Sequence, residues 1–135
     1  MNMRKKIPYL VLLLFTAFGC FPTTFPEIKS VLGGDWVGTI SIPDLNQSEM
    51  LSFTINSQSG SDFEGTFETS NNRFGPIIGS LNGSAISATM TFKDLCEGSA
   101  QVLGTLSNDK KSISGNGNAN DCKGGYSFTF TVAKQ

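Results

Sequence analysis

Residues 77–92 read IIGSLNGSAISATMTF and carry the strongest local structural signal in the chain. Apolar and polar side chains alternate along both halves of this stretch, which is the pattern of strands with one buried face. Between the halves lies Asn82-Gly83, a dipeptide typical of two-residue β-hairpin turns. The stretch therefore predicts two antiparallel strands that turn at residues 82–83 and share one apolar face.

The same alternation continues on both sides of this hairpin, with no helical period between residues 35 and 132. Mostly short connections join the alternating segments, and short connections favour antiparallel neighbours. The pattern predicts an all-β fold, an eight-stranded antiparallel up-and-down barrel, with a two-sheet β-sandwich as the alternative. The expected strands are 36–42, 51–56, 63–68, 77–81, 86–92, 100–106, 113–115 and 126–132.

One face of these strands is rich in aromatic side chains and glycines. An eight-stranded barrel is just wide enough to be filled by its side chains or to hold one small ligand. The bulky aromatics favour a filled interior, and a lumen for a small apolar molecule is the alternative. Inward glycines would relieve crowding and let the strands bend. The candidate barrel-lining residues are Trp36, Phe53, Phe63, Phe67, Met90, Phe92, Tyr126, Phe128 and Phe130, and the inward glycines are Gly38, Gly65, Gly79, Gly104 and Gly115.

The N-terminal residues have the organisation of an export signal. A basic start (Arg4, Lys5 and Lys6) precedes an apolar run over residues 7–17. This run is shorter than the roughly 20 residues that span a bilayer, and it has the length of a signal-peptide core. An ordinary secretory signal would leave Cys20 as a free thiol.

The sequence Ala17-Phe18-Gly19-Cys20 resembles the lipobox of bacterial lipoproteins. That resemblance implies a signal peptide over 1–19 and a diacylglycerol thioether on Cys20, which anchors the mature chain to a membrane of the cell envelope. Phe21 in place of Asp after the cysteine favours the outer membrane. Residues 20–34 then form a lipidated linker, of which the fourteen residues 21–34 reach at most roughly 46 Å, and residues 35–135 form the barrel domain.

Cys96 and Cys122 remain as an even pair in an exported chain, and such a pair predicts a disulfide. In an up-and-down meander the two cysteines lie in connections at the same end of the barrel, as a bridge requires. The expected loops 43–48, 70–75 and 116–124 lie at that end too, opposite the linker. We expect these distal loops to face away from the membrane.

Two short motifs resemble the calycin group of lipocalins and avidins. Gly34-Asp35-Trp36 is similar to the Gly-x-Trp that opens their first strand, and Gly65-Thr66-Phe67 to the Gly-Thr-aromatic of the third avidin strand. The resemblance implies a calycin-like barrel. It does not imply biotin binding, because avidins surround biotin with several tryptophans and Trp36 is the only one here.

Composition argues against several classes of function. The chain has no histidine, which removes the commonest general base and metal ligand. From Cys20 onward seven basic residues face eleven acidic ones, so no basic surface for nucleic acid is expected. The asparagines at 116, 118 and 120 lack the Gly and Glu of a calcium loop, and Asp62, Glu64 and Glu68 have the pattern of a solvent face. We expect no enzyme, no cofactor and no metal site.

Once these classes are set aside, we expect the protein to be a membrane-anchored module that binds a partner or a ligand. Residues 114–119, Ser-Gly-Asn-Gly-Asn-Ala, resemble in part the Ser-Gly-Ser-Gly-Ala loop of small bacterial barrels that inhibit lysozymes. That resemblance implies an inhibitor-type module whose distal loops bind a partner protein. The alternative is a carrier that holds a small hydrophobic ligand inside the barrel. The expected partners are a membrane, through the lipid, and either a protein or a small apolar molecule.

Overall fold

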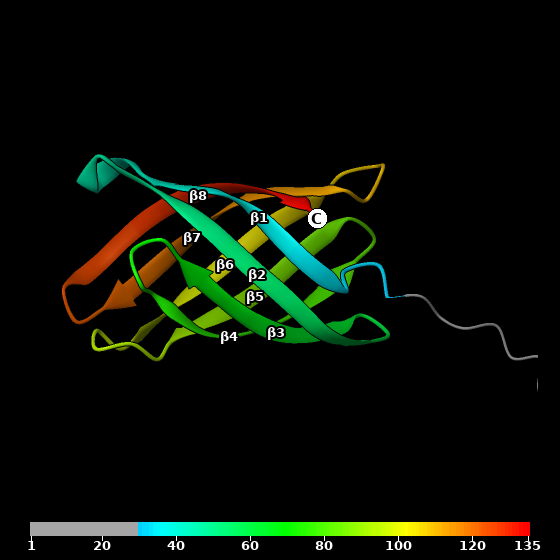
Figure 1. The fold of residues 1–135 in the computed structure, drawn as a ribbon, viewed down its shortest axis with the longest axis horizontal. Helices are drawn as coiled ribbons and strands as arrows, with labels where there is room; N and C mark the ends of the chain where they lie inside the picture. The colour runs from blue at the N-terminus through cyan, green and yellow to red at the C-terminus, as the bar shows by residue number, and fades with distance from the viewer. Residues whose placement is uncertain (1–29) are drawn as a thin grey trace, which may run out of the picture.

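The computed structural model describes residues 30–135, so the predicted signal peptide, Cys20 and most of the predicted linker lie outside the described residues. The described chain forms a closed barrel in which every strand pairs antiparallel with its sequence neighbours and the first pairs with the last (Figure 1). The predicted eight-stranded barrel is thereby confirmed over a sandwich. Its elements are β1 (Gly34–Ile42), η3 (Pro43–Leu45), β2 (Gln47–Ser59), β3 (Asp62–Thr69), β4 (Phe74–Asn82), β5 (Ala85–Phe92), β6 (Gly98–Leu106), β7 (Ser112–Asp121) and β8 (Gly124–Lys134).

The barrel has two unlike ends (Figure 1). At the proximal end the chain enters β1, and the β2–β3, β4–β5 and β6–β7 turns lie beside it. At the distal end lie the β1–β2, β3–β4, β5–β6 and β7–β8 connections. Cys96 and Cys122 form the predicted disulfide across two of these distal connections, with 5.1 Å between their Cα atoms.

The core lies inside the barrel, and inward positions follow the period of two along each strand. No polar or charged residue is fully buried among residues 30–135. Within the same residues no helix is long and apolar enough to cross a membrane.

The proximal end is closed by residues that the sequence analysis assigned to the linker. Leu32 is 1% exposed, and its carbonyl oxygen accepts a hydrogen bond of 2.9 Å from the fully buried Trp36 indole. The Gln58 side-chain oxygen accepts from the Leu32 amide at 3.0 Å and from the Ser30 hydroxyl at 2.9 Å. Residues 30–33 therefore pack onto the barrel, and the barrel itself includes Gly34.

Strand β7 is much longer than the predicted 113–115, and it absorbs most of the expected distal loop 116–124. The asparagines at 116, 118 and 120 lie on the exposed face of this strand. Its inward residues are small because Gly117 pairs with Phe128, whose ring would overlap any added Cβ. The alternation of asparagine and glycine looks like a turn locally, but pairing with β6 and β8 makes it a strand.

Several other boundaries also differ from the prediction, among them the start of β2 and the β4–β5 turn. Strand β2 begins at Gln47, four residues before the expected start, and it has a bulge between Ile55 and Ser57. The β4–β5 hairpin turns at residues 83–84, one residue later than expected. Gly83 has φ +62° and Asn82 pairs with Ala85, which matches a turn with glycine at its first central position.

Candidate functional site

The interior of the barrel is divided into a packed half and a hollow half. The proximal half contains a cavity of only about 30 Å³ with an apolar lining, close to the volume of one water molecule. The distal half contains a cavity of about 290 Å³, lined by inward side chains and by residues of the distal connections. We call this second cavity the distal cup. The sequence analysis offered a filled or a hollow interior as alternatives. The proximal half of the barrel is filled, and the distal half is hollow.

The floor and lower walls of the distal cup are apolar. Phe67 on β3 and Phe92 on β5 meet edge to face, with ring centroids 5.8 Å apart and an interplanar angle of 74°. Both rings are buried, as are the other apolar floor residues, which are Ile40, Ile42, Met90, Ala100 and Phe128. An apolar body placed in the cup would lose contact with water against these side chains.

The upper wall is built around Arg73 in the β3–β4 connection. Its Nε lies 2.7 Å from a carboxylate oxygen of Asp94, and its Nη1 lies 3.0 Å from one of Asp121. Its Nη2 donates to the carbonyl oxygen of Cys96 at 3.0 Å, and its guanidinium lies 4.1 Å from the centre of the Phe92 ring. Arg73 therefore joins the β3–β4 connection, the β5–β6 connection and the end of β7.

The pKa shifts of Arg73 and Asp94 both favour the charged forms of these two side chains. Burial by itself raises the pKa of Asp94. Hydrogen bonds from the Arg73 guanidinium and the Cys96 amide lower it by more than this, so the pKa lies below its usual value. Burial likewise lowers the pKa of Arg73, and its hydrogen bonds to Asp94 and Asp121 more than offset that effect. Only 10% of the Asp94 side chain and 3% of the Asp121 side chain are exposed, so solvent screens the pairs weakly.

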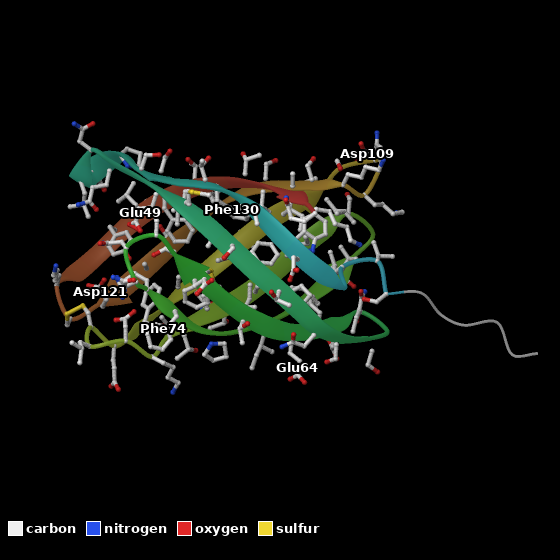
Figure 2. All side chains as sticks on the ribbon, in the orientation of Figure 1. Glu49, Glu64, Phe74, Asp109, Asp121 and Phe130 are labelled. Carbon is white, nitrogen blue, oxygen red and sulfur yellow. A yellow bond between two sulfur atoms is a disulfide. The ribbon has the colours of Figure 1, made fainter. Side chains whose placement is uncertain are left out.

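Two further polar residues line the cup, Glu49 on β2 and Tyr126 on β8. Glu49 pairs with Ile40 across the β1–β2 ladder, and its Oε2 is buried without a hydrogen-bond partner among the described residues. Tyr126 is partly buried, and its oxygen accepts a hydrogen bond of 3.5 Å from Arg73 Nη1. Burial raises the pKa of Tyr126, and the negative charges of Asp121 and Glu49 add to this effect, which outweighs the lowering by Arg73. Figure 2 shows Glu49 and Asp121 at the same, distal end of the barrel.

The disulfide lies at the outer edge of this wall. Asp121 is close to both sulfur atoms, so Cys96, Asp121 and Cys122 have the spacing of a metal-binding group. Because the two sulfurs are bonded to each other, neither is a thiolate that could act as a ligand. The group is therefore a covalent brace for the rim.

Eight of the nine candidate lining residues line one or both of the two cavities. The distal cup contains Phe67, Met90, Phe92, Tyr126 and Phe128. The small proximal cavity contains Phe53, Phe63, Met90, Phe128 and Phe130. Trp36 lines neither, because it stacks on Phe53 at 6.1 Å and closes the proximal end.

Sequence reasoning missed the polar members of the cup. Glu49 could have been found by continuing the alternation of β2 backward from Leu51, and Asp121 by continuing β7 beyond residue 115. Arg73 gave no such signal, because it lies in a connection and reaches its partners through a long side chain.

No protein-family model and no curated protein sequence matches this chain. Among solved structures it is similar to a redesigned β-barrel, with a TM-score of 0.63, 17% identity, and coverage of 78% of this chain and 92% of that one. It is similar to a second redesigned β-barrel, mFAP1 bound to DFHBI, with a TM-score of 0.60, 17% identity, and coverage of 77% and 95%. At these identities the likeness shows a shared fold.

Proposed function

We propose that this protein is an exported, non-enzymatic barrel that binds one small, partly apolar ligand in the distal cup. The observation that carries the proposal is the division of the interior. A cavity of about 290 Å³ with an apolar floor and polar walls lies at the distal end, above a packed core. Ligand sites in proteins are typically concave, mostly apolar and provided with a few placed polar groups.

The cup is also preformed. Arg73 connects three segments of its wall, and the disulfide holds two of the distal connections together. A site whose walls are already ordered loses little conformational entropy when a ligand binds. Burial of apolar ligand surface on the floor would contribute about 25 cal/mol per Å², and the polar walls would orient the ligand.

The proposal includes the membrane placement that the lipobox resemblance implies. Residues 20–29 could separate an acylated Cys20 from Ser30 by at most roughly 35 Å. Because the chain enters at the proximal end, this tether would leave the distal cup facing away from an envelope membrane (Figure 1). Mass spectrometry of the native protein should find an acylated Cys20 at the N-terminus. An unmodified N-terminus at another residue would refute the anchor.

Cup binding can be tested with a blocked variant and a matched control. Gln47 and Ser48 are both exposed at the start of β2, but only Gln47 lines the cup. We expect the neutral dye N-phenyl-1-naphthylamine to bind wild type and Ser48→Trp alike, and Gln47→Trp at least tenfold more weakly. Organic extracts of the native protein should contain a stoichiometric small molecule that is lost from Gln47→Trp. Equal dye binding by all three proteins would refute the proposal.

A second candidate is a protein partner that docks on the distal rim. Leu45, Phe74 and Leu95 lie in or beside three distal connections, and 53%, 49% and 106% of their surfaces are exposed. Exposed apolar side chains at one end of a molecule favour contact with another protein. Chemical crosslinking in the native envelope would identify such a partner. Its loss in Phe74→Ser/Leu95→Ser, which leaves the cup lining unchanged, with retention in Gln47→Trp, would favour docking over small-ligand binding.

A further inference from the structure

We propose that the distal cup selects ligands with a cationic, ammonium-type head group beside their apolar body, and that Glu49 binds this head group. The inference rests on the proposed function, because it names the ligand class of the same cup. It follows from three features of the cup: its charge balance, the lack of a hydrogen-bond partner for Glu49 Oε2, and the neutral phenol of Tyr126.

Counted together with Asp94, which pairs with Arg73, the charged groups of the cup have a negative balance. The carboxylates of Glu49 and Asp121 line the cup, and Asp94 lies outside the lining. Arg73 is the one cation within ion-pair distance of any of these three carboxylates among the described residues. Lys123 also lies at the mouth, but it is exposed, and water and salt screen its charge. The cup therefore favours a cation over an anion.

Arg73 is not available to an anionic ligand. Its Nε, Nη1 and Nη2 already contact Asp94, Asp121 and the Cys96 carbonyl, and its face lies over Phe92. A carboxylate ligand could reach the guanidinium only by displacing one of these nearly buried carboxylates. Separating a buried ion pair in this way is strongly unfavourable.

Glu49 is the wall carboxylate without a counterion. Its Oε2 is buried and has no hydrogen-bond partner among residues 30–135, while Ile40 lies opposite it on β1. A carboxylate oxygen withdrawn from water without a donor raises the free energy of the folded protein. An ammonium group offers N–H donors and a positive charge, so its binding would remove this cost. An alcohol would remove less of it and a carboxylate none.

Tyr126 provides a second polar contact for the same head group. Its pKa is raised, so the phenol stays neutral. Its oxygen accepts a hydrogen bond of 3.5 Å from Arg73 Nη1 and has a second lone pair that can accept another.

The test uses the full chain and three probes with the same tail, namely octylamine, octanol and octanoate, at pH 7. Each is titrated against bound N-phenyl-1-naphthylamine. We expect wild type to bind octylamine at least tenfold more tightly than octanol, and octanoate most weakly. Glu49→Gln should abolish the advantage of the amine over octanol and leave octanol binding unchanged.

The matched control is Glu97→Gln, which makes the same charge change at an exposed distal residue that does not line the cup. It should keep the full preference for octylamine. Glu49→Asp, which retains the charge on a shorter side chain, should keep part of it, and this variant provides the test if Glu49→Gln fails to fold. The amine preference of wild type should also weaken as salt is raised.

The outcomes separate the two proposals. Equal binding of the three probes, a preference for octanoate, or an amine preference that survives in Glu49→Gln would overturn the role of Glu49. In each of these cases the probes still bind, so the cup remains a ligand site. Binding of no probe, or binding unaffected by Gln47→Trp, would overturn both the cationic selectivity and the cup itself.

Discussion

The Arg73 side chain extends from the β3–β4 connection, and its guanidinium lies between the carboxylates of Asp94 and Asp121, which are almost completely shielded from solvent. Replacement by alanine would leave Asp94 and Asp121 without their counterion. Because removal of one partner from a buried ion pair is costly, we expect Arg73→Ala to lower the free energy of unfolding by about 3 kcal/mol. Urea denaturation with the disulfide intact measures this change. Lys93→Ala, at an exposed cation beside the same connection, should change it by less than about 0.5 kcal/mol.

The same residues predict how stability depends on pH. The pKa of Asp94 is lower in the folded protein than in an unfolded chain, where it is about 3.9. Its contribution to stability is therefore fully present above that value and is lost as the pH falls through the folded-state pKa. Thermal melts between pH 7 and pH 2 should show a steeper loss below about pH 4 for wild type than for Asp94→Asn. Parallel curves would show that Asp94 does not carry the effect.

At the scale of elements, the disulfide joins the β5–β6 connection to the β7–β8 connection across 26 residues of chain. On the chain-entropy estimate, closing a loop of this length contributes about 3.5 kcal/mol. We expect the double variant Cys96→Ser/Cys122→Ser to lose about this much stability. Hydrogen exchange should rise most at the distal ends of β6 and β7, with the β2–β3 turn at the proximal end as the internal control. A uniform rise along the barrel would contradict a local brace.

Elements also differ in how far the sequence predicts them. Strands β5 and β6 match their predicted ranges closely because their inward residues are apolar and their outward residues polar. Strand β7 was predicted too short, since its inward side is glycine and alanine and carries no apolar signal past Ile113. Its extent is set by the neighbouring strands, above all by Phe128, which occupies the space that Gly117 leaves.

At the scale of the whole molecule, the packed core and the proposed binding site lie in opposite halves of the barrel. Leu32 closes the proximal end and lines the small cavity, whereas it has no contact with the distal cup. We expect Leu32→Ser to lower the free energy of unfolding by about 2–4 kcal/mol, as loss of a buried leucine does. Binding of N-phenyl-1-naphthylamine should change by less than twofold. A large loss of dye affinity in the folded variant would show that the two halves are coupled. Val31→Ser, at a half-buried neighbour, should cost less stability.

By itself the sequence predicted an antiparallel meander, the buried face of each strong strand, and the bridge between Cys96 and Cys122, whereas the pairing of β1 with β8 decided between a barrel and a sandwich. These predictions follow from alternation along the chain and from the order of connections, both of which are local properties. Only the tertiary structure decided that the interior is packed at one end and hollow at the other. It also decided that Arg73 meets Asp94 and Asp121 while Glu49 meets no partner. The physical reason is that a barrel brings side chains from distant strands into one space. Which of them meet, and how much space they leave, depends on their combined lengths and charges and cannot be predicted from the sequence of one strand.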